Sequence, residues 1–168
     1  MRACILNIQP KRCWKLVCAL SNCVTKAIGA ALHIGQEDLT PKDARRVLGA
    51  DLILGYSTHN QAQLMQADTE PVDYLALGPI FGTASKTNPD PIVGLDELTR
   101  LRPLTNKPLV AIGGITIEQA ISVLEAGADS VAIISGLLSD PKQVRHTTEQ
   151  WLKTLNSLPP RSWSKAWG

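Results

Sequence analysis

The sequence predicts an α/β fold of the (β/α)8, or TIM barrel, type, and three observations support this prediction. Short apolar runs alternate along the chain with amphipathic segments that have the spacing of helices. Most of these runs lack polar alternation, as expected for parallel strands that are covered on both faces. A polar or glycine-containing group follows each run, and in a barrel the carboxyl ends of all strands meet at one rim.

Five apolar runs are the predicted strands, namely residues 31–34, 52–56, 73–77, 109–112 and 130–134. The polar groups that follow them are residues 36–38, 57–59, 78–86, 113–114 and 135–136. Periodicity alone also allows a doubly wound open sheet, but that fold would gather such groups at a single switch point. Polar groups after five successive strands therefore favour the barrel.

Two of the predicted helices have clear ends. In the first, Thr40 is expected as the N-cap before Pro41, and Gly49 closes the helix. In the second, Thr116 and Gln119 have the spacing of a capping box. Three further helices are predicted with weaker signals, over residues 60–67, 94–102 and about 141–156.

The composition indicates one globular domain and argues against nucleic acid as the main partner. The chain has 168 residues, of which 44% are hydrophobic and 19% charged. Residues 1–36 contain five Lys or Arg and no acid, so the remainder carries 12 basic against 15 acidic residues. Because the later basic residues form no stripe with interleaved aromatics, we expect no nucleic-acid interface.

Four cysteines lie in the leading segment, at positions 4, 13, 18 and 23. Their spacing matches neither CxxC nor a usual zinc pattern, so we expect reduced thiols in a cytoplasmic protein. No apolar run is long enough for a membrane span, and no secretory cleavage signal is present. An organelle transit peptide is the alternative interpretation of the basic leader, but the segment is poor in Arg and Ser.

Two glycine-containing turns predict a phosphate site. "IGGIT" at residues 112–116 and "IISGLLSD" at residues 133–140 follow the last two predicted strands. Glycine allows close backbone approach, free N–H groups attract phosphate, and paired turns at this place recur in barrel enzymes. The alternative for the first turn is a tight connection that needs positive φ.

Several other rim residues could carry chemistry. Asp38 could ligate Mg2+, which binds few protein carboxylates together with substrate phosphates, or its charge could simply favour the next helix. In the long loop after residue 77, Thr83, Ser85 and Lys86 offer hydroxyl donors and a cation to phosphate oxygens. The glycine-rich P-loop motif is absent.

Two histidines also attract interest. His33 lies inside an apolar strand, which favours a hydrogen-bonded core residue over a catalytic one. His59 lies at the rim, where it suits either an acid or base or the N-cap of the following helix.

At these positions the chain resembles thiamine-phosphate synthases of the thiamine synthase/TenI family. The similarity spans about residues 27–140 and rests on "AIGAALHIGQEDL", "GYSTH", "DYLALGPIFGTASK", "VAIGGIT" and "AGADSVAIISG". The resemblance implies a TIM barrel enzyme that joins hydroxymethylpyrimidine pyrophosphate to a thiazole phosphate. It also implies a reaction in which pyrophosphate leaves first and the thiazole nitrogen attacks the resulting pyrimidine methyl cation.

The resemblance also implies roles for individual residues. Asp38 would be a Mg2+ ligand, and Ser57 and Lys86 would contact the pyrimidine pyrophosphate, with Lys86 as the catalytic group. The thiazole phosphate would be lined by Thr83, Ala84, Ser85, Gly114, Ile134 and Ser135.

The sequence departs from the family before "HIGQED", where family members have three more strands. The resemblance therefore implies an incomplete barrel with about strands 4 to 8 present. We expect a basic leader at residues 1–26, the partial barrel domain at 27–158 and a tail at 159–168. Open barrel edges would favour an oligomer or a partner that covers them.

The motifs and the family resemblance leave three functional hypotheses open. The first is a thiamine-phosphate synthase domain acting on small-molecule substrates. The second is a TenI-type thiazole tautomerase that uses His59 as acid or base, although "GQED" and "TASK" count against it. The third is a noncatalytic remnant that binds phosphate, which the acid-free leader supports.

Overall fold

The computed structural model describes residues 2–6, 17–20, 31–83, 90–138 and 142–156. Its strands are β1 (Arg2–Leu6), β2 (Val17–Leu20), β3 (Ala31–Ile34), β4 (Ile53–Thr58), β5 (Tyr74–Leu77), β6 (Leu109–Ile112) and β7 (Ser130–Ile133). Its helices are α1 (Pro41–Leu48), α2 (Gln61–Asp68), α3 (Gly94–Leu101), the 3-10 helix η1 (Arg102–Leu104), α4 (Ala120–Glu125), α5 (Ser135–Leu138) and α6 (Val144–Asn156).

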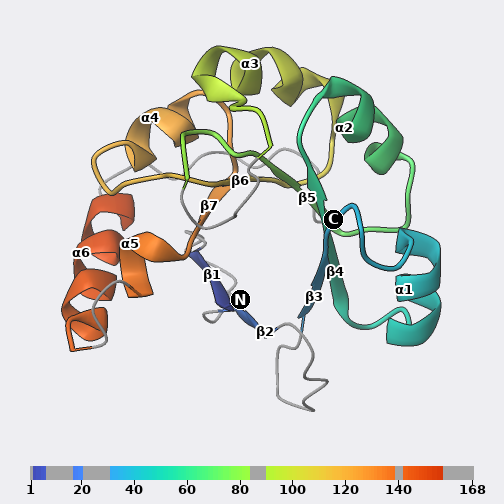
Figure 1. Cartoon of the computed structure of the whole chain (residues 1–168), viewed down its shortest axis with the longest axis horizontal. Coiled ribbons are helices and arrows are strands. Elements are labelled where there is room, and N and C mark those ends of the chain that lie inside the picture. The colour runs from blue at the N-terminus through green and yellow to red at the C-terminus, as the bar shows by residue number, and fades with distance from the viewer. Residues whose placement is uncertain (1, 7–16, 21–30, 84–89, 139–141, 157–168) are drawn as a thin grey trace.

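Strands β3 to β7 form a parallel, curved half-barrel with the helices on its outer side (Figure 1). Each strand pairs in register with the next along the chain, from Leu32 with Leu54 to Ala111 with Val131. The five predicted strands are therefore present, and their parallel order agrees with the predicted α/β barrel class.

Strands β4 to β7 each contribute to two apolar layers, whereas β3 contributes to the main core. The outward residues pack under the helices in the main core, for example Leu54, Leu75 and Val131 against Leu64 and Trp151. The inward residues form a smaller cluster of Tyr74, Ala76 and Val110, with Ile53, Ile112 and Ala132 packed against it. Because both faces are apolar, the strands show no polar alternation in the sequence.

The leading segment contributes a hairpin that the sequence did not predict. β1 and β2 pair antiparallel, and β1 also pairs antiparallel with β7, with Cys4 opposite Ile133. The expectation of an open edge at β7 is therefore wrong, because β1 occupies that edge. At the other end of the strand order β2 lies near β3, so the seven strands curl toward a ring (Figure 1).

The helix ends agree with the prediction in α1 and differ in α4. Thr40 caps α1 by accepting the Asp43 N–H, and Gly49 follows the helix with φ of 82°. α4 begins only at Ala120, because residues 116–119 form a turn. One arm of the expected capping box forms there, in which the Thr116 N–H donates to the Gln119 side chain at 3.1 Å.

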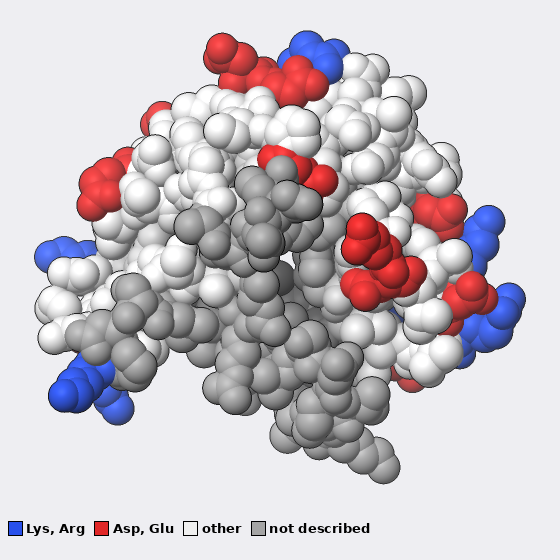
Figure 2. All heavy atoms as spheres, viewed as in Figure 1, with Lys and Arg blue, Asp and Glu red and all other residues white. Residues whose placement is uncertain are grey.

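The surface carries charges of both signs. In the face shown in Figure 2, Asp and Glu lie in groups over the helical side, with Lys and Arg beside them or near the periphery. Among the residues that the structure describes, no helix is long and apolar enough to cross a membrane.

Candidate functional site

The carboxyl ends of the parallel strands bring most of the described candidate residues to one rim. Asp38 follows β3, Ser57 lies near the end of β4, and Gly114 follows β6. Thr83 lies in the segment after β5, and Ile134 and Ser135 follow β7. The remaining candidates, Ala84, Ser85 and Lys86, lie outside the described residues.

The two glycines after β6 form a tight turn against the segment that follows β5. Gly113 and Gly114 have φ of 86° and 67°, so the alternative interpretation of this turn, a tight connection that needs positive φ, agrees with the structure. A Cβ on Gly113 would overlap Pro79, and one on Gly114 would overlap the Phe81 and Gly82 carbonyls. The Phe81 N–H donates to the Gly113 carbonyl at 3.1 Å. Neighbouring backbone therefore explains the requirement for glycine.

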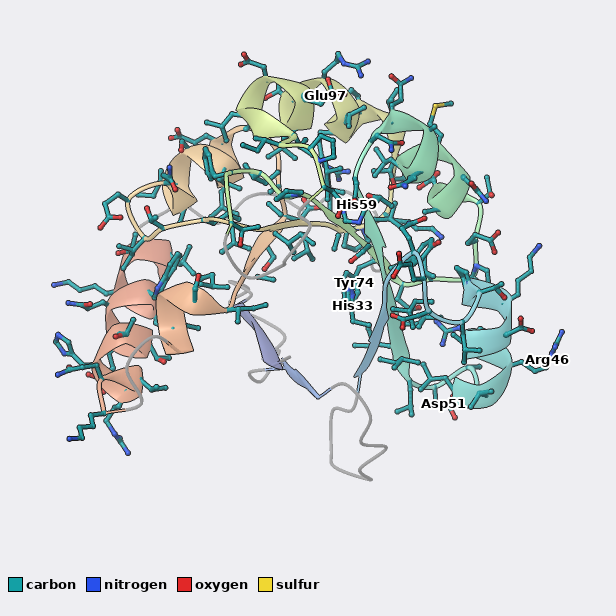
Figure 3. All side chains as sticks on the ribbon, viewed as in Figure 1. His33, Arg46, Asp51, His59, Tyr74 and Glu97 are labelled. Atoms are coloured by element: carbon teal, nitrogen blue, oxygen red, sulfur yellow. The ribbon has the colours of Figure 1, made fainter. Side chains whose placement is uncertain are left out.

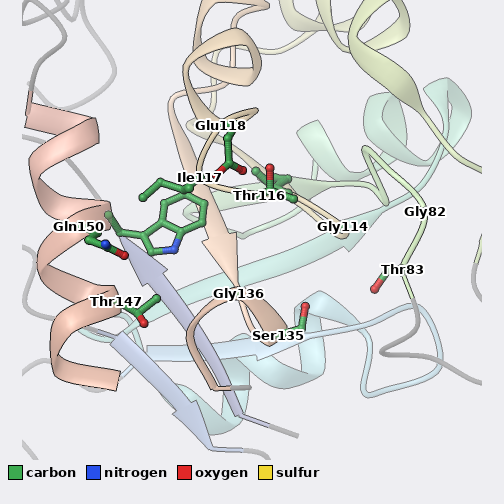
Figure 4. Close-up of a pocket in the computed structure, with 12 residues that line it drawn as sticks. Gly82, Thr83, Gly114, Thr116, Ile117, Glu118, Ser135, Gly136, Thr147 and Gln150 are labelled. Atoms are coloured by element: carbon green, nitrogen blue, oxygen red, sulfur yellow. The ribbon is translucent and has the colours of Figure 1, made fainter. Parts of the chain in front are cut away.

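A pocket of about 350 Å³ opens beside this turn (Figure 4). Three residues of the predicted phosphate site, Thr83, Gly114 and Ser135, lie on its wall. Ile134 is not among the residues that line it. Sequence reasoning missed the wall contributed by α6, which consists of Thr147, Gln150 and Trp151. Their spacing of three and four residues is a signal for one helix face, although it does not indicate what the face lines.

The described wall of the pocket is polar and carries one anionic side chain. Glu118 lies at the rim of the pocket, and a hydrogen bond from the Thr116 hydroxyl lowers the pKa of its carboxyl. The uncharged polar groups include Thr147, Gln150 and Ser135. A phosphate here would need hydroxyl and backbone donors together with a cation to offset the Glu118 charge.

Asp38 lies in an exposed turn directly after β3. Its Oδ2 accepts the Gly35 N–H at 2.7 Å, which fixes the carboxylate at the rim. The described residues contain no cluster of three or more His, Cys, Asp or Glu that would form a metal cage. A single carboxylate nevertheless fits Mg2+ that is shared with substrate phosphates, since this ion often takes only one or two protein carboxylates.

Ser57 belongs to a hydrogen-bonded group on the inner face of the strands. His33 contacts the Ser57 Oγ through Nε2 at 2.8 Å and the Tyr74 hydroxyl through Nδ1 at 3.0 Å. The His33 and Tyr74 rings stack with centroids 5.6 Å apart, and Figure 3 shows them side by side inside the curve of the sheet. The prediction that His33 is a hydrogen-bonded interior residue is confirmed. The sequence did not indicate that Tyr74 is one of its hydrogen-bond partners.

Burial sets the protonation of this group. It lowers the pKa of His33 to about 4, against a smaller opposing effect of the nearby Asp38 carboxylate. Burial also raises the pKa of Tyr74. Both side chains are therefore uncharged at neutral pH.

His59 lies outside the pocket wall. Its Nδ1 donates to the Gly78 carbonyl, and its Nε2 lies 3.5 Å from an Asp90 carboxylate oxygen. The helix cap is the next residue, since Asn60 accepts the Gln63 N–H at 3.0 Å, so the N-cap interpretation of His59 is wrong. Only 11% of the His59 side chain is exposed, and it is not part of the pocket wall.

Comparison with known proteins shows the family to which the chain belongs. The family model described as thiamine monophosphate synthase (TMP-TENI) matches residues 22–137. A thiamine-phosphate synthase of Koribacter versatilis is 57% identical over 126 residues, which cover 75% of this chain and 58% of that protein. One of Chlorobium phaeovibrioides is 42% identical over 119 residues, covering 70% and 57% respectively.

A solved structure agrees with these sequence matches. The thiamine phosphate pyrophosphorylase of Pyrococcus furiosus is 30% identical and superimposes with a TM-score of 0.66, covering 76% of this chain and 59% of that one. The chain thus spans less than two thirds of the length of these relatives.

Proposed function

Because the chain belongs to the thiamine monophosphate synthase family, we propose that it joins hydroxymethylpyrimidine pyrophosphate to a thiazole phosphate and releases pyrophosphate. The observation that carries this proposal is the shared pocket of Thr83, Gly114 and Ser135. It lies at the same strand rim as Asp38 and Ser57. A cytoplasmic location, in keeping with the expected reduced thiols, is part of the same proposal.

The placement of the chain within the family barrel is also a proposal. The segment matched by the family contains all five parallel strands, and its relatives are longer. We assign β3 to β7 to strands 4 to 8 of that barrel. In this assignment the β1–β2 hairpin occupies the edge of β7 where a further barrel strand would otherwise pair.

The proposed chemistry needs no nucleophilic side chain from the protein. The pyrophosphate departs with its electrons, the pyrimidine methyl cation forms, and the thiazole nitrogen attacks it. Lys86 and the Ser57 hydroxyl would contact the leaving group and stabilise the charge that develops on it. Mg2+ held by Asp38 and the substrate would supply further neutralisation of that charge.

The second substrate fits the pocket by size and by polarity. A volume of about 350 Å³ lies at the lower end of the range typical for small-molecule sites. Ser135, Thr83 and the turn at Gly114 would donate to the thiazole phosphate. The family resemblance adds Ala84 and Ser85 to these contacts, whereas Ile134 would not contact the phosphate from the pocket wall. A cation such as Lys86 is required because Glu118 would otherwise repel the phosphate.

An assay of thiamine phosphate formation by the full chain tests this proposal. We expect product with the wild type and a loss of at least about a hundredfold with Lys86→Ala, because a fixed charge opposite the leaving group is removed. Lys42→Ala is the matched control, since Lys42 is exposed on α1 and should leave the rate unchanged.

The assay also separates the alternatives. Thiazole isomerisation by the chain that is lost in His59→Ala would contradict the synthase proposal and support a tautomerase. The absence of turnover with either reaction, in a chain that still binds phosphate, would support the noncatalytic remnant.

A further inference from the structure

Three neighbouring strands bring His33, Gly55 and Tyr74 into one row on the inner face of the half-barrel. His33 pairs with Gly55 across β3 and β4, and Gly55 pairs with Tyr74 across β4 and β5. A Cβ on Gly55 would overlap the Tyr74 ring. Because Gly55 has no side chain, Tyr74 can reach across β4 to His33 (Figure 3). Ser57 lies two residues after Gly55, on the same face and nearer the rim.

This arrangement restricts where the protons lie. A neutral histidine has one ring N–H and one acceptor nitrogen, and here each nitrogen contacts a hydroxyl. In one arrangement Tyr74 donates to Nδ1, and the Nε2–H donates to Ser57. In the other arrangement Ser57 donates to Nε2, and the Nδ1–H donates to the Tyr74 oxygen.

The environment of Tyr74 favours the first arrangement. Tyr74 is 7% exposed, and in the described part of the chain His33 is the only hydrogen-bond partner of its hydroxyl. If Nδ1 donated to Tyr74, the phenolic proton would stay buried without an acceptor, which costs more than leaving a lone pair unused. The proton of Ser57, in contrast, can point toward the rim, where water or a ligand accepts it.

We propose that Tyr74 and His33 are positioning residues that fix the Ser57 hydroxyl as a hydrogen-bond donor toward an anionic oxygen of the substrate. This inference rests on the proposed function, because Ser57 contacts the pyrimidine pyrophosphate only there. With the Oγ accepting from His33, the Ser57 proton is free to bind a phosphate oxygen. The opposite tautomer would direct that proton inward and present lone pairs to the anion, which would weaken binding.

Nitrogen NMR of the 15N-labelled full chain tests the tautomer without requiring activity. The shift of each ring nitrogen reports whether it carries a proton. Assignment follows from the loss of one histidine signal in His33→Gln. We expect Nε2 to be protonated and Nδ1 to be unprotonated at neutral pH. A protonated Nδ1 in the wild type would overturn the inference.

Binding of inorganic pyrophosphate in the presence of Mg2+, measured by calorimetry, tests the consequence. Ser57→Ala should lower the affinity about tenfold or more, as expected for a lost hydrogen bond to a charged group. Tyr74→Phe removes the donor to Nδ1, so both tautomers become populated and the affinity should fall severalfold. Tyr56→Phe is the matched control, since Tyr56 lies on the outer face of the adjacent strand against the helices.

The possible failures are distinguishable. If Tyr74→Phe keeps the wild-type tautomer and affinity, the positioning role is wrong even when Ser57 binds the anion. If the tautomer is as expected but Ser57→Ala binds pyrophosphate like the wild type, the substrate contact assumed in the proposed function is wrong, and the inference is overturned with it.

Discussion

At the scale of single residues, the position of Tyr74 depends on what is absent at Gly55. The Tyr74 ring occupies the space that a side chain on Gly55 would fill, in the middle of the smaller inner cluster. Protein interiors are packed too closely for that space to serve both side chains. Tyr74 can therefore occupy its place on the inner face of the sheet because Gly55 has no side chain.

Gly55→Ala is expected to destabilise the fold by about 1–3 kcal/mol, the typical cost of overpacking a core. The free energy of unfolding from urea titration measures this effect. Gly82→Ala serves as the control, because its Cβ would meet only Ile92 at 3.9 Å and should change stability by less than about 0.5 kcal/mol. Equal effects of the two substitutions would contradict the packing argument.

The buried His33 predicts a pH dependence of stability. Its pKa is about 4 in the folded chain against 6.5 when unfolded, so the unfolded state binds more protons between these values. The contribution of His33 is fully present above pH 6.5 and is lost as the pH falls toward 4. The wild type should lose up to about 3 kcal/mol relative to His33→Gln over this window.

Urea unfolding of both proteins at several pH values from 7 to 4 checks this expectation. The other titrating groups are common to the two proteins and cancel in the difference. A difference that stays constant over the whole range would show that His33 is not held neutral.

At the scale of elements, helix α1 shows how local sequence fixes an end. The Thr40 hydroxyl oxygen accepts the Asp43 N–H at 3.2 Å, and its proton is donated to the Asp43 carboxylate at 2.7 Å. The helix thereby gains a partner for one of its free N–H groups and a negative charge in its first turn.

Thr40→Ala should lower the free energy of unfolding by about 1 kcal/mol, because the cap is lost. Thr40→Ser keeps the hydroxyl and should retain most of that stability. Thermal and urea denaturation of the two variants provide the comparison. A serine variant that is as unstable as the alanine variant would rule out the capping explanation.

Helix α1 and the parallel strands could be predicted because their signals are local. Thr40, Pro41 and Gly49 mark the ends of α1 within the sequence itself, and the strands are continuous apolar runs. The start of α4 was predicted too early, because the Thr116 hydroxyl bonds Glu118 in place of capping the helix. The wall of the pocket on α6 was missed because it depends on how distant elements pack.

The row of His33, Gly55 and Tyr74 was missed for a related reason. Its members are 19 to 41 residues apart, and only the strand register brings them together. The sequence indicated an interior, hydrogen-bonded His33, but it could not identify the partners.

At the scale of the whole molecule, the leading hairpin completes the sheet beside β7. Pairing of β1 with β7 joins residues that are more than 120 positions apart. No local sequence pattern indicates a contact over this distance, so no strand was predicted in the leading segment. The hairpin replaces an unpaired strand edge, which would otherwise be a template for association.

Removal of residues 1–22 should therefore expose the β7 edge. We expect faster amide exchange within residues 130–133 and a larger mass by light scattering than for the full chain. Exchange in β5 should stay slow, since that strand keeps both of its parallel neighbours. If the truncated chain shows the same exchange at β7 and the same mass, the hairpin does not cover that edge.

In the proposed function, the carboxyl ends of successive strands together hold a divalent cation and the anionic leaving group. Titration of inorganic pyrophosphate into the full chain, with and without Mg2+, tests it on the wild type and on Asp38→Asn. The asparagine can still accept the Gly35 N–H, so the turn is kept while the charge is removed. Asp51→Asn, at an exposed site outside the rim, is the control (Figure 3).

We expect pyrophosphate to bind only with Mg2+ present and at least about tenfold more weakly to Asp38→Asn than to the wild type. Binding that needs no Mg2+, or that is equally strong in Asp38→Asn and Asp51→Asn, would contradict it.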